Sequence, residues 1–179
     1  RRIGANGYPY GANEMFYDLC HMMSEKPWVD QYFAFLNLES DCCPTKPGWT
    51  HDLSVAFLEA AAEDKVMIGH YCKNHTLPHM NGVGVYSCEK TVKLFGAAAG
   101  GPANAAYDIH WAKKIVPVGK DVPEIFFDFN RKTITADELF APRKDGLTPV
   151  LYHGVKDDSA FNAVRDEHIV GGARDTGKN

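Results

Sequence analysis

The chain has 179 residues, of which 45% are hydrophobic and 23% are charged, an ordinary composition for a soluble globular domain. Its formal net charge of −4 gives no global electrostatic attraction for nucleic acid, and no apolar run approaches the ~20 residues needed to span a bilayer. We expect no signal peptide, and the five cysteines show no disulfide spacing. A cytoplasmic protein with reduced thiols is therefore expected.

Apolar spacing and turn residues predict an alternation of helices and strands along the chain. Helices are expected over 13–23, from Thr50 or Asp52 to about residue 63, and over 89–95. Strands are expected over 32–38, 66–69, 82–86, 124–129 and 150–152, with a Gly/Ala/Pro-rich loop over 97–106. This order predicts a single α/β domain over residues 1–170, followed by a flexible polar tail over 171–179.

The buried strand expected before residue 39 runs into two carboxylates, Glu39 and Asp41. Residues i and i+2 of a strand face the same way, so we expect the two acids side by side. Two carboxylates on one face repel each other unless a cation lies between them, and a divalent cation with oxygen ligands is the usual solution. The prolines in residues 42–49 predict a turn there, which places the acids at the carboxyl end of a strand, where open α/β sheets bind ligands.

Five segments, in this order, resemble one known family. They are Gly7–Phe16, Glu39–Trp49, Pro78–Tyr86, Tyr107–Asp108 and Tyr152–Asp157. Together they resemble GT-A glycosyltransferases, most closely the small phage and large-virus glycosyltransferase-like proteins, whose DxD motif is similar to Glu39-Ser40-Asp41. Ala12 departs from the pattern, because the family more often has proline there.

The resemblance implies a GT-A-like, Rossmann-type fold with a mixed, largely parallel central sheet flanked by helices. The first β-α-β part of that fold, which grips the base of the donor, has no counterpart among the five segments. We therefore expect that an N-terminal part is missing or that the domain is reduced.

The implied activity is transfer of a sugar from a nucleotide-diphosphate donor, such as a UDP- or GDP-sugar, to a hydroxyl of a glycan, a protein or a modified nucleic-acid base. Such a reaction releases a diphosphate, whose charge a bound Mn²⁺ (or Mg²⁺) neutralises. The resemblance also implies a phage or viral protein in the host cytoplasm that has no membrane partner.

The resemblance assigns a shared metal site to Asp41 and His153, which converge from distant parts of the chain. It assigns the general base to Asp108, provided that the enzyme inverts the anomeric centre. Six further residues are expected to contact the donor: Asn13, Glu39, His79, Asn81, Gly82 and Lys156. Glu39 would bind the ribose or reach the metal through water, and Lys156 would pair with the departing diphosphate as a point charge.

Each assignment has a purely structural alternative. Glu39 and Asp41 are then a solvated pair at a strand end, and Asp108 is a helix cap. The remaining candidates then satisfy local backbone groups or lie in solvated turns: Asn13, His79, Asn81, His153 and Lys156.

Two other function classes remain open. The first is a non-catalytic binding or structural module that retains the fold. The second is a small zinc-binding domain, because four N/S ligand types occur within ten residues: His70, Cys72, His75 and His79. A basic strip of Lys113, Lys114 and Lys120 would permit local contact with nucleic acid, and its alternative is a solvated loop.

Overall fold

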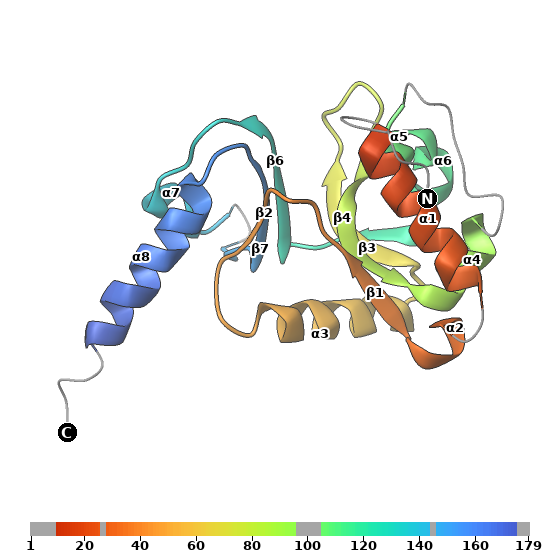
Figure 1. Cartoon of the computed structure of the whole chain (residues 1–179), viewed down its shortest axis with the longest axis horizontal. Helices are drawn as coiled ribbons and strands as arrows, with labels where there is room; N and C mark the ends of the chain where they lie inside the picture. The colour runs from red at the N-terminus through yellow and green to blue at the C-terminus, as the bar shows by residue number, and fades with distance from the viewer. Residues whose placement is uncertain (1–9, 26–27, 96–104, 144–145, 175–179) are drawn as a thin grey trace. The chain divides into compact units, whose positions relative to one another are not determined.

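The structure is a computed structural model that describes residues 10–25, 28–95, 105–143 and 146–174. The contacts of the chain divide it into two compact units, each built around its own sheet (Figure 1). Unit 1 comprises residues 1–37 and 56–122, and unit 2 comprises residues 38–55 and 123–179. The division passes through helix α3 (Trp49–Ala62) between Val55 and Ala56.

The sheet of unit 1 has the strand order β1-β4-β3-β5. Its strands are β1 (Ala34–Asn37), β3 (Met67–Cys72), β4 (His79–Ser87) and β5 (Gly119–Asp121). Strand β4 is antiparallel to both of its neighbours, whereas β5 is parallel to β3. The helical segments are α1 (Tyr10–Ser24), α2 (Trp28–Gln31), α4 (Cys88–Phe95), α5 (Tyr107–His110), α6 (Ala112–Ile115) and the 3₁₀ turn η2 (Val116–Val118).

Helix α1 anchors the core of unit 1 through one apolar face. Phe16, Cys20 and Met23 are buried, and their spacing of four and three residues places them on one side of the helix. The Phe16 ring stacks on Tyr107 of α5, with centroids 3.9 Å apart, and lies 5.7 Å from the ring of Tyr86 in β4. These contacts hold the start of α5 against β4.

The sheet of unit 2 has the strand order β2-β7-β6. Its strands are β2 (Cys42–Pro44), β6 (Ile125–Arg131) and β7 (Leu151–Val155), and its helices are α7 (Ala136–Phe140) and α8 (Ser159–Arg174). The central strand β7 is buried at every residue, antiparallel to β2 and parallel to β6. One apolar cluster joins the sheet to α7 and α8: Cys43, Ile134, Leu139, Tyr152, Val155 and Ala160.

The structure confirms a mixed α/β fold, but the single, largely parallel central sheet is only partly borne out. The described strands form two mixed sheets with three antiparallel and two parallel pairings. In unit 1, β3 and β4 pair antiparallel because the connection between them, residues 73–78, is too short for a parallel crossover. The GT-A assignment itself stays a prediction.

The predicted helices over 13–23, 50–63 and 89–95 and most predicted strands appear within a few residues of their expected bounds. The prediction of a turn over residues 42–49 is wrong for the first three residues, because Cys42–Pro44 forms strand β2. Pro44 is tolerated because β2 is an edge strand. Helix α8 extends to Arg174, into the residues expected as a tail.

Some expectations fall on residues outside the described ranges. These are the start of the Gly7–Phe16 segment at residues 7–9, residues 97–104 of the loop expected over 97–106, and the end of the tail at residues 175–179.

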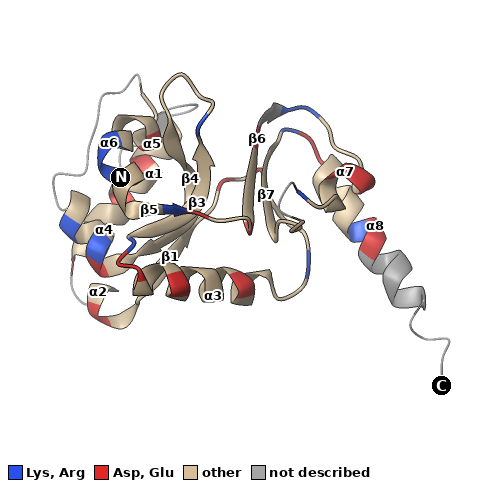
Figure 2. Cartoon of the chain, turned by 180° about the vertical axis from the view of Figure 1, so that it is seen from behind, with Lys and Arg blue, Asp and Glu red and all other residues tan. Residues whose placement is uncertain are grey.

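The three lysines of the expected basic strip lie on α6 and β5 of unit 1. Helix α6, which is blue in Figure 2, carries Lys113 and Lys114 of the expected basic strip, and the Lys114 ammonium lies 4.5 Å from the centre of the Trp111 ring. Lys120 pairs with Glu63 at 2.6 Å. Among the described helices, none is long and apolar enough to cross a membrane.

We predict that Gly154→Ala lowers the free energy of unfolding by about 2–5 kcal/mol, measured by chemical denaturation. Gly154 has φ +109°, and a Cβ there would lie 2.2 Å from the carbonyl oxygen of Asp128. Gly48→Ala is the control, because Gly48 has φ +73° with open space around its Cβ, so only a backbone penalty of about 1–2 kcal/mol is expected. Equal losses in the two variants would contradict this prediction.

Candidate metal centre

A tight turn, and not a strand end, presents the two carboxylates. Strand β1 ends at Asn37, and the backbone N–H of Cys42 donates to the carbonyl oxygen of Glu39 at 3.1 Å. This bond closes a four-residue turn with Ser40 and Asp41 at its centre. The i, i+2 alternation of strand side chains, from which the two acids were expected side by side, therefore does not apply to Glu39 and Asp41, but both acids project from the same short segment just before β2.

The register of the sheet directs His153 away from the apolar core of unit 2. Strand β2 pairs Cys43 with Tyr152 and Cys42 with His153. Cys43 and Tyr152 belong to the core cluster with α7 and α8, and side chains alternate between the faces of a strand. His153 therefore faces the opposite side of β7, next to the turn that leads into β2.

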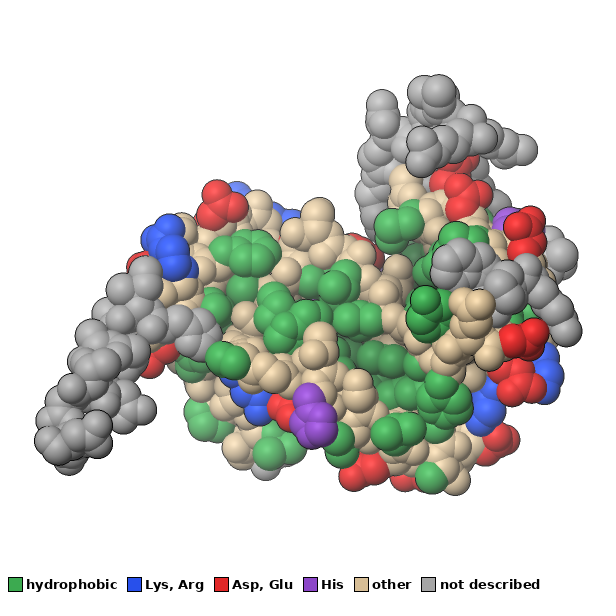
Figure 3. All heavy atoms as spheres, turned by 60° about the horizontal axis from the view of Figure 1, so that its bottom comes forward, with side chains coloured by type: hydrophobic (Ala, Val, Ile, Leu, Met, Phe, Trp, Pro, Cys, Tyr) green, Lys and Arg blue, Asp and Glu red, His purple; other side chains and the backbone are tan. Residues whose placement is uncertain are grey.

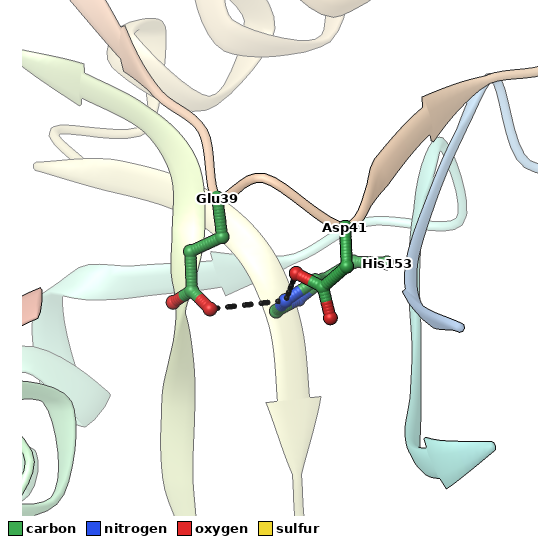
Figure 4. Close-up of side chains that lie close together, drawn as sticks. All are labelled: Glu39, Asp41 and His153. Atoms are coloured by element: carbon green, nitrogen blue, oxygen red, sulfur yellow. Dashed lines mark ion pairs between the residues drawn. The ribbon is translucent and has the colours of Figure 1, made fainter. Parts of the chain in front are cut away.

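The imidazole of His153 lies between the two carboxylates (Figure 4). Its Nε2 is 3.2 Å from Oδ1 of Asp41 and 3.3 Å from Oε2 of Glu39. The side chain of His153 is only 2% exposed, that of Asp41 15% and that of Glu39 34%, so the site is open on the Glu39 side. Among the described residues, these three form the one group of at least three His, Cys, Asp or Glu whose ligand atoms all lie within 4.8 Å.

The site favours the charged forms of Asp41 and His153 despite their burial. Burial disfavours ionised Asp41, but hydrogen bonds from His153 and Lys156 outweigh it and hold the pKa of this carboxyl well below its usual range. Burial also disfavours the imidazolium of His153, but hydrogen bonds to Asp41 and Glu39 outweigh it and raise the pKa of His153 above its ordinary value. The two carboxylates therefore stabilise a cation bound to Nε2 of His153, whether it is a proton or a metal.

Two carboxylate oxygens and one imidazole nitrogen form a mixed donor set. Carboxylates suit Mg²⁺, Ca²⁺ and Mn²⁺, whereas imidazole suits Zn²⁺ and Fe²⁺ and is a poor partner for Mg²⁺. Mn²⁺ accepts both donor types, so it fits this set better than Mg²⁺. Three protein ligands on a partly open site leave coordination positions for water or a ligand.

A second group of predicted residues assembles in unit 1. Oδ2 of Asp108 accepts the backbone N–H of Gly82 at 3.1 Å and lies 3.8 Å from Nε2 of His79, while Oδ1 accepts the N–H of Ile109 at 2.9 Å. His79 donates from Nδ1 to the carbonyl oxygen of Leu77 at 2.7 Å, since a carbonyl can only accept. Both side chains are largely buried.

Asn13 ties the start of α5 to α1, next to this group. Its Nδ2 donates to Ala105 O at 2.8 Å and its Oδ1 accepts the N–H of Tyr107 at 2.7 Å. Asn37 at the end of β1 donates to Gly82 O and to the hydroxyl of Tyr107. The predicted residues of unit 1 are thus linked through Tyr107 and β4, where they satisfy buried backbone groups. Asp108 is not the helix cap that its structural alternative expected, because the N-cap of α5 is Ala106.

The structure thus separates the predicted site residues by unit. Asn13, His79, Asn81, Gly82 and Asp108 belong to unit 1, whereas Glu39, Asp41, His153 and Lys156 belong to unit 2.

Sequence reasoning gave Glu39 an indirect role, but the structure places its carboxylate directly against His153. It also missed Asn37, which donates to the carbonyl oxygen of Gly82 and to the hydroxyl of Tyr107. The signal for Glu39 was its i−2 spacing from Asp41, whereas no local pattern marks Asn37.

The histidines and cysteine of the zinc alternative do not converge. No three of His70, Cys72, His75 and His79 bring ligand atoms within 4.8 Å in the described structure. The rings of His75 and His79 meet edge to face at 4.9 Å, while Cys72 pairs with His79 across β3 and β4. A tetrahedral zinc shell is therefore not assembled by this segment.

A pocket of about 170 Å³ in unit 1 contains none of the predicted site residues. It is lined by Val29, Tyr32, Phe33, Ala61, Lys65, Ser87, Glu89 and Lys90. Tyr32, Phe33 and Leu58 are among the exposed apolar side chains of this unit, and Figure 3 shows apolar side chains at the surface on one face of the molecule. The pocket lacks convergent acids and imidazoles, so the chemistry points to the triad instead.

Comparisons with protein-family models, with curated proteins and with solved structures gave no match. The resemblance to GT-A glycosyltransferases therefore rests on the five sequence segments alone, and the chemistry of the site follows from its own geometry.

We predict opposite pH dependences for metal binding and for the stability of the metal-free protein. A metal needs neutral His153, so Mn²⁺ affinity should rise as pH increases through the raised pKa of His153. The protonated imidazole, by contrast, stabilises the metal-free fold fully below its unfolded pKa of about 6.5, and this stabilisation is lost as pH rises through the folded value. Calorimetry and thermal melting test both slopes.

His153→Gln is the control, since it removes the titrating group. Its melting temperature should lack the part of the pH slope that His153 contributes. An Mn²⁺ affinity of the native protein that is constant from about pH 6 to 8.5 would contradict the assignment.

Proposed function

We propose that the chain is a divalent-metal-dependent glycosyltransferase that moves a sugar from a nucleotide-diphosphate donor to a hydroxyl acceptor. The observation that supports this most is the convergence of Glu39 and Asp41 with His153, more than a hundred residues later in the chain, within 4.8 Å. The resemblance assigned a shared metal to Asp41 and His153, and in unit 2 these two residues lie together with Glu39 beside them.

The chemistry of donor cleavage explains why this donor set is useful. A bound Mn²⁺ would neutralise the charge that develops on the diphosphate leaving group. Asp41 and His153 would hold the cation from the buried side, and Glu39, which is more exposed, would complete the protein's share of the shell. Lys156, at the end of β7, would add a point charge for the diphosphate.

The acceptor side of the proposal rests on Asp108 of unit 1. A carboxylate that takes the proton of an acceptor hydroxyl is needed if the anomeric centre is inverted. Asn13, His79, Asn81 and Gly82 surround this part of unit 1 and would contact the donor or acceptor through their polar groups.

We predict that the protein binds Mn²⁺ and that Asp41→Asn weakens this binding by more than about 100-fold. Loss of a residue that only supports a metal ligand typically weakens binding 10–100-fold, and Asp41 would be a ligand itself. Titration followed by electron paramagnetic resonance of free Mn²⁺ measures the change directly. UDP and GDP should then bind only when Mn²⁺ is present, as measured by calorimetry.

Asp52→Asn is the matched control for this experiment. Asp52 lies in the same unit, is 33% exposed and pairs with Lys46 at 2.5 Å, but it is not part of the triad. Its substitution should leave Mn²⁺ affinity nearly unchanged. Equal effects of the two substitutions, or no binding by the native protein, would refute the metal site.

One observation favours the alternative, a non-catalytic module that retains the fold. Both oxygens of Asp108 accept backbone N–H groups, and its side chain is 12% exposed, which is the environment of a structural carboxylate. In this reading, Asp108 fixes β4 against α5, and only the metal site of unit 2 is functional.

Asp108→Asn separates the two readings. An amide NH₂ next to the N–H of Gly82 leaves donors unpaired, so we expect a loss of about 1–3 kcal/mol and a melting temperature lower by about 2–12 °C. A catalytic Asp108 predicts in addition that hydrolysis of UDP-sugars with Mn²⁺ disappears at temperatures where the variant is fully folded. Retained hydrolysis in the folded variant would remove Asp108 from the proposal.

A further inference from the structure

Lys156 forms an ion pair with the carboxylate of Asp41, the same group that faces His153. Its Nζ pairs with Oδ2 of Asp41, while Oδ1 of the same group faces His153 at 3.2 Å. Both oxygens of Asp41 are therefore engaged by groups of the protein itself. The backbone N–H of Lys156 donates to Arg131 O at 2.9 Å, so its main chain is held on β6 and only the side chain is able to move.

The side chain of Lys156 is the group that yields when a second cation arrives. It is 50% exposed and carries a flexible four-carbon stem, whereas His153 is buried within β7. A divalent cation bound to Asp41 would lie beside the ammonium of Lys156 on the same carboxylate. Two positively charged groups that share one carboxylate repel each other. The electrostatic repulsion is relieved if the ammonium turns toward solvent.

We propose that Lys156 is a built-in competitor for the metal: it holds Asp41 in the metal-free protein and is released by the cation to pair with an anionic ligand. This inference rests on the metal site of the proposed function and adds its regulation. With a neutral His153, the side chains of Glu39, Asp41 and Lys156 carry one net negative charge without metal and one net positive charge with a divalent cation. Replacement of the Lys156 ammonium by the metal on Asp41 therefore makes metal and anion binding cooperative. Each ligand raises the affinity for the other by the same factor.

The test is Mn²⁺ binding to the full chain with Lys156→Met, which keeps an unbranched stem and removes the charge. Loss of the competitor should tighten Mn²⁺ binding by about three- to tenfold, since an ion pair of this exposure is weak but its acceptor is largely buried. Lys46→Met is the matched control, because Lys46 lies in the same unit, is 53% exposed and pairs with an acid outside the triad. Its Mn²⁺ affinity should change by less than about twofold.

Inorganic phosphate tests the second half of the exchange. Phosphate should increase the Mn²⁺ affinity of the native protein, and this increase should be lost or much reduced in Lys156→Met. Lys156→Gln should behave in the same way as Lys156→Met, and thermal melting of both variants verifies that they are folded.

The outcomes distinguish this inference from the proposed function. If the native protein binds Mn²⁺ but Lys156→Met binds it equally or more weakly, the competitor is refuted while the metal site stands. An unchanged phosphate effect in the variant would refute the coupling. No Mn²⁺ binding by the native protein would overturn both the inference and the metal site.

Discussion

The position of one buried imidazole between two carboxylates is the constraint on which the chemistry of this protein depends. His153 lies in the central strand of its sheet, where burial alone would keep it neutral, yet Glu39 and Asp41 approach its Nε2 to 3.3 and 3.2 Å. Such an arrangement is stable only if positive charge resides among the three groups. In the protein alone, a proton and the ammonium of Lys156 supply it, and a divalent cation would supply it more completely.

The features around the triad follow from this requirement. The turn at residues 39–42 carries both acids and leads directly into β2, which pairs with β7 and brings Asp41 to His153. Gly154 permits the backbone of β7 to pass close to Asp128, which keeps the following Lys156 near Asp41. The order of residues 153–156 therefore has a physical meaning: Gly154 allows the close approach of two strands, and His153 and Lys156 share one acid, Asp41.

Part of this arrangement is predictable from local sequence. Helix α1 is predicted by the spacing of Phe16, Cys20 and Met23, because one apolar stripe fits only a helical period. The pairing of Asp41 with His153 was expected only through the resemblance of scattered segments, since no local pattern links residues more than a hundred positions apart.

The failures have equally specific causes. Pro44 suggested a turn, but an edge strand tolerates proline, so β2 was missed. The division into two sheets depends on non-local pairing of β2 with β7 and of β1 with β4, which alternation of strands and helices does not encode. The role of Asn37 was not predicted, because it donates hydrogen bonds to the carbonyl oxygen of Gly82 and the hydroxyl of Tyr107 only once β1 and β4 have paired.

The most direct test of the metal centre is an anomalous diffraction map of crystals grown with MnCl₂. We predict one Mn²⁺ peak about 2.0–2.3 Å from Oε2 of Glu39, an oxygen of Asp41 and Nε2 of His153, with the ammonium of Lys156 displaced from Asp41. A map without a peak between these residues, with Lys156 still paired to Asp41, would contradict the assignment of this triad as a metal site.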